Sequence, residues 1–283
     1  MANKTFALIT GASEGLGKAF ALECAARKMN LILVALPGIA LYHLASSIER
    51  NFKVTVKVFE KDLTIEADCL SLYQEISEQH LGINMLVNNA GIGNCCAFED
   101  AQIASFQQLI KLNIMATTML TRLFVDLLKC HPKSYILNIS SLIAFFNLPN
   151  KQVYGGTKSY IYYFSNCLRN ELAHLNISVS VLCPGGMNTN PRLYRLMSSG
   201  NWFVRNAMMS PESVATIAIT GLLKGQPIMI PGKLNKLSLL IDKLLPHRLH
   251  QYCTRLLTKR VTSPAIIQNL SQQETHINLP ASA

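Results

Sequence analysis

The sequence predicts an α/β fold in which helices cover both faces of one parallel sheet. Short apolar runs alternate with longer stretches of helical periodicity, and several runs are almost continuously apolar, as strands buried on both faces are. With 283 residues, 49% of them hydrophobic, the chain can bury the core of one large domain. We therefore expect a single doubly wound sheet.

The elements are expected in alternation along the chain. Strands are expected at 5–10, 31–36, 53–59, 85–88, 134–140, 177–183 and 227–230, and helices at 15–28, 39–50, 65–80, 101–130, 153–174 and 211–224. The core domain should span 1–231, with an irregular segment at 188–210. A basic, leucine-rich helical extension should follow at 232–261, and a polar, flexible tail at 262–283.

Cysteine usage and the N-terminus favour an intracellular protein without a metal site. The eight cysteines form no C-x-x-C pair and no His cluster accompanies them, so we expect reduced, structural thiols and no zinc site. The apolar run at 5–10 is too short for the core of a signal peptide, and no uncharged stretch is long enough to span a bilayer. The expected location is the cytoplasm.

A glycine-rich turn follows the first expected strand and opens the first helix. Gly11 permits the tight turn, Gly15 lets the backbone approach a pyrophosphate, and Gly17 permits close packing of helix on strand. The helix N-terminus then offers free N–H groups and a positive dipole end to a phosphate. A plain tight turn is the alternative, but the strand–turn–helix context favours a dinucleotide site.

Further motifs follow the later strands. Asn88-Asn89-Ala90-Gly91 follows the fourth strand, Ser141 the fifth, and a turn from Pro184-Gly185 to Thr189 the sixth. Alone, these are ordinary turn and cap residues. Asn113 lies within an apolar helical stretch, where a satisfied core amide or a local kink would also explain it.

Tyr154 and Lys158 stand four residues apart and share one face of an expected helix. A phenol with a pKa of about 10 is a poor acid or base at neutral pH, and a nearby ammonium lowers that pKa by favouring the phenolate. This gives the pair a mechanism, although surface Tyr–Lys pairs are common. Ser141 precedes Tyr154 by thirteen residues.

In order and spacing, these motifs resemble the short-chain dehydrogenase/reductase family. The resemblance implies a Rossmann-type fold and a catalytic tetrad of Asn113, Ser141, Tyr154 and Lys158. It also implies that Tyr154 exchanges a proton with the substrate oxygen, that Ser141 places that oxygen, that Lys158 holds the nicotinamide ribose and that Asn113 supports a water. Hydride would pass to or from a nicotinamide cofactor. The glycine pair Gly155-Gly156 departs from the family's usual small residues with side chains.

The expected cofactor is NAD(P)(H), with a weak preference for NADP(H). No carboxylate follows the second strand at Leu36, where NAD-dependent enzymes carry one, and no Arg or Lys stands there either. The resemblance implies these cofactor-binding residues: Gly11, Ser13, Glu14, Gly15, Leu16, Gly17, Leu36, Asp62, Leu63, Asn89, Ala90, Gly91, Tyr154, Lys158, Pro184, Gly185 and Thr189.

The substrate is expected to be a lipophilic ketone, 3-oxoacyl compound or alcohol. Candidate lining residues are mostly apolar: Ile92, Cys95, Cys96, Leu142, Phe145, Phe146, Leu148, Met187 and the segment 190–206. The stretch 231–237 resembles the family branch with 3-oxoacyl reductase-like and steroid dehydrogenase-like members. Each lining residue can equally serve only to pack loops together.

The extension at 232–261 supplies over half of the net charge of +10, with seven Lys or Arg residues against Asp242. A basic amphipathic helix can lie on an anionic membrane, meet an acyl-CoA, cap a subunit interface, or pack on the domain with solvated lysines. Nucleic acid is not an expected partner, because basic and aromatic residues do not interleave. The resemblance implies a homo-oligomer.

Three alternative functions remain. A non-catalytic dinucleotide-binding protein on the same fold would lack one member of the tetrad, and all four are present. A membrane-surface protein would depend on 232–261. A sugar epimerase of the same wider family differs in glycine spacing and has a longer substrate domain.

Overall fold

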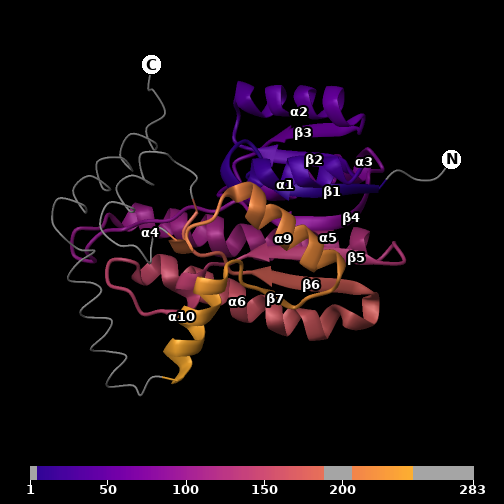
Figure 1. Ribbon diagram of the computed structural model, residues 1–283. Coiled ribbons are helices and arrows are strands. Elements are labelled where there is room, and N and C mark those ends of the chain that lie inside the picture. Colours follow the sequence, from indigo (N-terminus) through magenta and orange to yellow (C-terminus); the bar gives the residue numbers. More distant parts are fainter. Residues whose placement is uncertain (1–4, 188–205, 245–283) are drawn as a thin grey trace.

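The described strands form one parallel sheet. Figure 1 shows them one above another, from β3 near the top to β6 and β7 near the bottom. The computed structural model describes residues 5–187 and 206–244. Within these ranges the sheet has seven strands in the order β3-β2-β1-β4-β5-β6-β7, and every neighbouring pair is parallel. The strands are β1 (Thr5–Thr10), β2 (Asn30–Ala35), β3 (Val56–Glu60), β4 (Gly82–Asn88), β5 (Ser134–Ile139), β6 (Ile177–Leu182) and β7 (Ile228–Met229).

The order of the strands reverses between β1 and β4, which are neighbours although β2 and β3 intervene in the sequence. In open α/β sheets, ligands bind outside the carboxyl ends of the strands at such a reversal. The topology therefore places a ligand crevice where β1 and β4 end. The predicted doubly wound Rossmann-type fold is confirmed.

Helices cover both faces of the sheet (Figure 1). One apolar core packs α1, α2 and α9 against the sheet, and a second packs α3, α5 and α6 against the other face. The helices are α1 (Gly15–Ala26), α2 (Ile39–Phe52), α3 (Glu66–Glu78), α4 (Ile103–Ile110), α5 (Thr117–Leu128), α6 (Gln152–Leu172), α9 (Pro211–Leu223) and α10 (Lys233–Leu244), with short helical turns η1 (Lys111–Ala116), η2 (Leu142–Phe145) and η3 (Ala173–Leu175).

Alternation along the central strand explains the two cores. In β1, Ala7 and Ile9 belong to the first core, whereas Phe6 and Leu8 belong to the second. Because successive side chains of a strand point to opposite faces, a continuously apolar strand is buried on both sides. All four side chains are at most 4% exposed.

Several expected boundaries were wrong. The strand expected at 31–36 ends at Ala35, and Leu36 lies beyond it, 62% exposed. The strand expected from residue 53 begins at Val56, because Lys53 has a left-handed backbone (φ 58°) that ends α2. The strand expected from residue 85 already begins at Gly82, which pairs with Thr5.

The helix expected at 101–130 runs without a break from Ile103 to Leu128, but it is not a regular α-helix throughout. It consists of α4, one turn of π-helix at η1, and α5. A π-turn inserts an extra residue into a helix and is often found at functional sites. Here the wider turn contains Asn113, so the unfavourable residue in the apolar stretch marks a real irregularity.

Buried amides join the middle of the sheet to the helices behind it. Asn88 of β4 donates to Asn138 of β5 (2.8 Å) and to Thr121 of α5 (3.0 Å). Asn138 in turn donates to Ser165 of α6 (3.0 Å). All four side chains are at most 3% exposed, so these bonds form in a medium where unpaired polar groups are costly. The network fixes α6 relative to the ends of β4 and β5.

The start of the extension packs against the domain. In α10, Asn235 is 3% exposed and donates to the carbonyl oxygen of Pro231 (2.8 Å). No helix in the described residues is long and apolar enough to cross a membrane. The remainder of the extension beyond Leu244, the tail at 262–283 and most of the expected irregular segment 188–210 lie outside the described residues.

We predict that Phe124→Ala destabilises the fold. Phe124 is fully buried in α5 and meets the edge of the Tyr73 ring at a centroid distance of 5.6 Å. Its removal leaves a cavity and should lower the free energy of unfolding by about 3–5 kcal/mol, measured by urea denaturation. Tyr163→Ala, which truncates a side chain that is 73% exposed, is the control and should change it by less than about 0.5 kcal/mol. Equal losses of unfolding free energy in the two variants would show that Phe124 is not part of the packed core.

Candidate active site

The turn between β1 and α1 has the shape of a phosphate cradle. Gly11 and Gly15 both have positive φ angles, 63° and 54°. A Cβ atom on Gly17 would collide with the carbonyl oxygen of Gly11, and one on Gly11 would lie 2.9 Å from the Cα of Ala90. Each glycine is therefore required, either by its backbone conformation or by close packing.

The first turn of α1 has no side-chain cap. Glu14 occupies the N-cap position, is exposed and makes no capping hydrogen bond, while Ser13 is half-buried and Leu16 packs into the core. The N–H groups of a helix start need partners, and together with the helix dipole they suit a phosphate. The residues present thus fit the pyrophosphate of a dinucleotide.

The cradle is tied to the end of β4. Thr10, 1% exposed, accepts hydrogen bonds at its Oγ1 from the backbone N–H groups of Asn89 and Ala90, both 3.0 Å long. The amide of Asn89 donates back to the carbonyl oxygens of Thr10 (2.9 Å) and Gly11 (3.2 Å). The motif 88–91 therefore sets the position of the glycine turn. Asn89, Ala90 and Gly91 thus have a structural role in addition to the cofactor contact expected of them.

Tyr154 and Ser141 meet at the carboxyl edge of the sheet. Tyr154 is half-buried near the start of α6, and its phenol is hydrogen-bonded to the Ser141 side chain, which follows β5. Burial raises the pKa of Tyr154, and the hydrogen bond from Ser141 opposes this rise. The net direction is opposite to the one expected from the Tyr–Lys spacing, because desolvation of the phenolate outweighs the effects that favour it.

Lys158 lies about one helical turn after Tyr154, on the same face of α6. Its ammonium Nζ donates to the carbonyl oxygen of Ile139 at the end of β5 (3.0 Å) and stands 5.9 Å from the centroid of the Tyr154 ring. The side chain is 7% exposed, and burial lowers the pKa of Lys158 from 10.5 to about 8. The nearby Cys183 thiol opposes this shift, and burial raises the pKa of that thiol to about 12.

Asn113 is held by the loop that follows β4. Its Oδ1 accepts from the N–H of Ile92 and its Nδ2 donates to the carbonyl oxygen of Ile92, both at 2.9 Å. The same Nδ2 donates to Thr157 of α6 (3.0 Å). A Cβ on Gly91 would lie 3.0 Å from the Asn113 Oδ1 and 3.3 Å from the Lys158 Nζ, so a glycine here lets both polar atoms approach. The structure thus brings together all four expected tetrad residues.

Two contributors were missed by the sequence analysis. Lys151 donates from its Nζ to the carbonyl oxygen of Asn94 (2.5 Å) and also lies 5.6 Å from the centroid of the Tyr154 ring. It stands three residues before Tyr154, a spacing that would have placed it on the same helix side. Thr157, which holds Asn113, precedes Lys158 and is 2% exposed. A small polar residue in a helix gave no signal of that contact.

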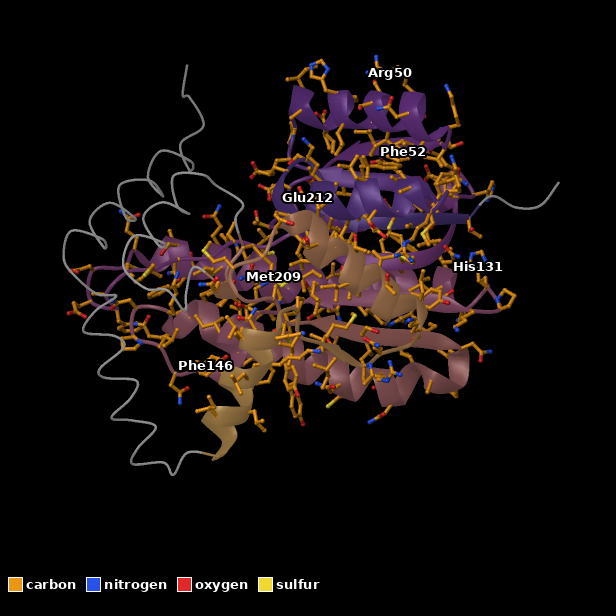
Figure 2. All side chains as sticks on the ribbon, in the orientation of Figure 1. Arg50, Phe52, His131, Phe146, Met209 and Glu212 are labelled. Atoms are coloured by element: carbon orange, nitrogen blue, oxygen red, sulfur yellow. The ribbon has the colours of Figure 1, made fainter. Side chains whose placement is uncertain are left out.

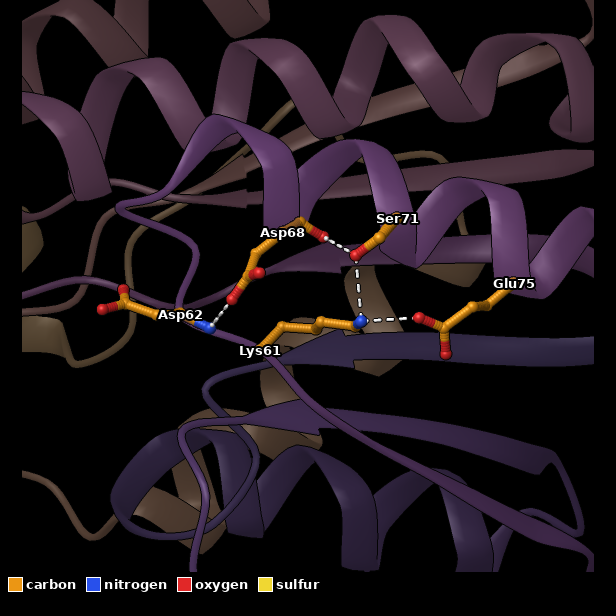
Figure 3. A network of polar contacts seen from close by, with 5 residues as sticks. All are labelled: Lys61, Asp62, Asp68, Ser71 and Glu75. Carbon is orange, nitrogen blue, oxygen red and sulfur yellow. Dashed lines mark hydrogen bonds and ion pairs between the residues drawn. The ribbon is translucent and has the colours of Figure 1, made fainter.

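The residues after β3 form their own polar network, shown in Figure 3. The backbone N–H of Asp62 donates to Asp68 of α3 (2.8 Å), and the Asp62 carboxylate accepts from Thr64. Lys61 donates to Ser71 (2.9 Å) and pairs with Glu75 (2.6 Å). Leu63 is buried in the second core. Asp62 thus lies at the carboxyl edge of the sheet, where an adenine contact is expected.

The turn after β6 closes the site on the other side. The carbonyl oxygen of Pro184 accepts from the N–H of Leu142 (2.8 Å), which joins this turn to the segment after Ser141. Gly185 is required by Asn235, because a Cβ there would lie 2.6 Å from the Asn235 Nδ2. Thr189, the last expected cofactor residue, lies outside the described residues.

Apolar side chains occupy the segments that follow β4, β5 and β6. Phe146 and Met209 lie toward the carboxyl edge of the sheet in Figure 2, whereas His131 lies at the opposite edge. Phe145 of η2 meets the edge of the Tyr162 ring at 4.7 Å between centroids, and the backbones of Met187 and Met209 form an isolated parallel β-bridge. Ile92, Cys95, Cys96 and Leu142 are half-buried, and Leu148 is 37% exposed. These positions suit an apolar ligand, and the expected segment 190–206, except for Asn206, lies outside the described residues.

Comparison with known proteins agrees with this geometry. Human 17-beta-hydroxysteroid dehydrogenase type 3 is 33% identical over 188 residues, which cover 65% of this chain and 59% of the human protein. Very-long-chain 3-oxoacyl-CoA reductase of Bos taurus is 28% identical over 237 residues, 79% of this chain and 72% of the bovine protein. The chain thus spans less than two thirds of the human relative's length.

A solved structure shares most of the architecture. The short-chain dehydrogenase from Sphingobium yanoikuyae in complex with NADPH has a TM-score of 0.71 and 26% identity, and the alignment covers 86% of this chain and 96% of that one. The family model described as short chain dehydrogenase matches residues 5–194, which run from β1 to beyond β6 and include the glycine turn, Ser141, Tyr154 and Lys158. This chain belongs to the short-chain dehydrogenase family.

Proposed function

We propose that the protein is an NAD(P)(H)-dependent oxidoreductase that interconverts a ketone or 3-oxoacyl group and a secondary alcohol. One observation carries this: the hydrogen-bonded Ser141–Tyr154 pair and the buried Lys158 stand at the carboxyl edge of the sheet, beside the phosphate cradle that follows β1. Family membership supports the reaction class, and the two curated relatives carry reductase and dehydrogenase names.

Tyr154 is the proposed proton donor during reduction. Because burial raises the pKa of its phenol, the group carries its proton at neutral pH and can give it to a carbonyl oxygen. The Ser141 hydroxyl, already hydrogen-bonded to Tyr154, would hold the same oxygen. In the oxidation direction, Tyr154 would have to be a phenolate in order to accept a proton, and the positive charge of Lys158 would favour formation of that phenolate.

Lys158 and Asn113 hold the proton-transfer residues in place. Lys158 is anchored to the carbonyl oxygen of Ile139, and Asn113 fixes the loop at Ile92 to α6 through Thr157. The cofactor supplies the hydride when bound. Residues proposed to hold it are the turn 11–17, the ends of β2 and β3 at Leu36 and Asp62, the segment 89–91, and the turn at Pro184 and Gly185.

The proposed substrate is lipophilic. Apolar side chains such as Ile92, Leu142 and Phe146 lie half-buried around the carboxyl edge of the sheet. The names of the two relatives, which specify a steroid and a very-long-chain acyl group, agree with this class. A non-catalytic dinucleotide-binding protein is the alternative, and it would bind cofactor without turning over any ketone.

We also propose that α10 contacts an anionic membrane surface. Leu237, Leu240 and Ile241 are 47–56% exposed and stand one helical turn apart, on a helix that exposes Lys233 and Lys236 as well. Apolar residues flanked by lysines suit the boundary between acyl chains and anionic headgroups. Such contact would bring the site close to a lipophilic substrate.

We expect Tyr154→Phe to abolish turnover. The change removes the phenolic proton but keeps the ring that packs beside Gly93, so cofactor binding should be largely preserved. Reduction of a panel of lipophilic ketones, followed by absorbance at 340 nm, should fall by about 100-fold or more, whereas cofactor affinity from a fluorescence titration should stay within about threefold. Near-normal turnover in this variant would exclude Tyr154 as proton donor, and absence of turnover in the unaltered protein would favour the non-catalytic alternative.

Lys158 should make the stability of the cofactor-free protein depend on alkaline pH. Its pKa is lowered in the folded state to about 8 from 10.5, so between these values the unfolded chain binds more protons than the folded one. Stability relative to Lys158→Met should therefore rise as pH increases from about 8 to 10, by on the order of 1–3 kcal/mol. Urea unfolding of both proteins across this range measures it, and a constant difference would show that Lys158 is not desolvated.

The membrane contact can be tested with vesicles. The full chain should co-sediment with vesicles containing phosphatidylserine and much less with pure phosphatidylcholine vesicles. The triple variant Leu237→Asn, Leu240→Asn, Ile241→Asn should bind the anionic vesicles at least about tenfold more weakly, because three apolar side chains no longer enter the interface. Ile217→Asn, on the exposed side of α9, is the control. Equal binding of the triple variant and its control would refute the contact.

A further inference from the structure

A carboxylate stands beside the end of β2, although the sequence carries none after that strand. Glu60 is the last residue of β3 and pairs in register with Ala35, the last residue of β2. Its side chain reaches across to the segment that follows β2, where its Oε1 accepts a hydrogen bond from the backbone N–H of Gly38 at 2.8 Å. The neighbouring strand thus supplies the acidic group missing at Leu36.

A second donor holds this carboxylate. Tyr42, in the first turn of α2, is 46% exposed and hydrogen-bonded to Glu60. Desolvation first, and then the charge and hydrogen bond of Glu60, raise the pKa of Tyr42, so the phenol remains protonated and donates to the carboxylate. Glu60 is therefore fixed between Gly38 and Tyr42.

The negative charge of Glu60 is not neutralised by an ion pair among the described residues. Its sequence neighbour Lys61 is engaged elsewhere, with Glu75 and Ser71, as Figure 3 shows. The adjacent strand ends add further carboxylates, Glu14 after β1 and Asp62 after β3. The carboxyl edge formed by β3, β2 and β1 thus carries Glu60 and Asp62 at the end of β3 and Glu14 after β1.

This edge is where the adenosine ribose of a dinucleotide lies in a doubly wound fold. An acidic residue beside the end of β2 accepts hydrogen bonds from the ribose hydroxyls, whereas a basic residue there accommodates a 2′-phosphate. Gly38 is also the N-cap of α2, and a helix N-terminus attracts anions. Glu60 already occupies its N–H, so a 2′-phosphate would meet a like charge and lose that donor.

We propose that Glu60 is a specificity-determining residue that makes the site prefer NAD(H), with its free ribose 2′-hydroxyl, over NADP(H). The proposal rests on the proposed function, since it concerns the same cofactor site. It reverses the preference expected from the sequence, which depended on the absence of a carboxylate at Leu36. The Sphingobium yanoikuyae structure holds NADPH, so this chain would differ from that relative at the ribose.

Calorimetric titration of the full chain with NADH and with NADPH tests the proposal without reference to turnover. The unaltered protein should bind NADH about tenfold or more tightly than NADPH. Glu60→Gln keeps an oxygen acceptor for Gly38 and Tyr42 but removes the charge. The Glu60→Gln variant should lower the ratio of NADH affinity to NADPH affinity at least about fivefold, mainly because it binds NADPH more tightly. Glu78→Gln, at the exposed end of α3, is the matched control and should leave the ratio unchanged.

Each outcome decides a different statement. Tighter binding of NADPH by the unaltered protein, or an unchanged ratio in a folded Glu60→Gln variant, would overturn the role of Glu60 and leave the oxidoreductase proposal standing. If neither dinucleotide bound to the folded protein, the proposed function itself would fail, and the inference with it.

A second variant covers the case in which Glu60→Gln does not fold. Leu36→Arg changes an exposed side chain and leaves Glu60 in place. A guanidinium there should strengthen NADPH binding by about fivefold or more and affect NADH little. Unchanged NADPH affinity would show that a 2′-phosphate does not reach this edge and would overturn the inference.

Discussion

The rest of the site depends on the hydrogen bonds that join the end of β1 to the end of β4. Thr10 receives the backbone N–H groups of Asn89 and Ala90, and the Asn89 amide returns to the carbonyl oxygens of Thr10 and Gly11. These strands come together only because the strand order reverses between them. The junction holds the phosphate cradle on one side and, on the other, the loop whose Ile92 engages Asn113. These four hydrogen bonds therefore hold the glycine turn in a fixed position relative to the residues proposed to transfer a proton.

Charge inside this frame is controlled by burial. Lys158 and Tyr154 lie in one desolvated region, where burial favours the neutral form of each: the pKa of the lysine falls and that of the tyrosine rises. Two neighbours act against this tendency: the hydrogen bond from Ser141 opposes the rise in the pKa of the phenol, and the Cys183 thiol opposes the fall in the pKa of Lys158. Desolvation therefore keeps the proton on Tyr154, the proposed proton donor, at neutral pH, whereas the sequence spacing alone predicted a lowered pKa.

Much of the fold and of the proposed tetrad was predictable because it depends on local signals. Buried strands read as apolar runs, glycines mark the cradle, and Tyr154 and Lys158 share a helix face at a fixed spacing. Features that depend on contacts between distant residues were not predictable. The π-turn contains Asn113, whose side chain is bonded to Ile92 and Thr157, residues that lie 21 and 44 positions away. Lys151 reaches Asn94 across 57 residues.

The same reasoning applies to the carboxylate beside β2. Cofactor preference is usually inferred from the charge of the residue that follows this strand, and Leu36 is uncharged. A parallel sheet, however, brings the end of the next strand into register, so that Glu60 lies beside Ala35 and reaches Gly38. A ribose or its 2′-phosphate would interact with all the charged groups at this edge of the sheet, and not only with the residue that follows β2. A carboxylate supplied by β3 can therefore influence cofactor preference when the residue after β2 is uncharged. Its position beside β2 can be recognised only when the pairing of the strands is known.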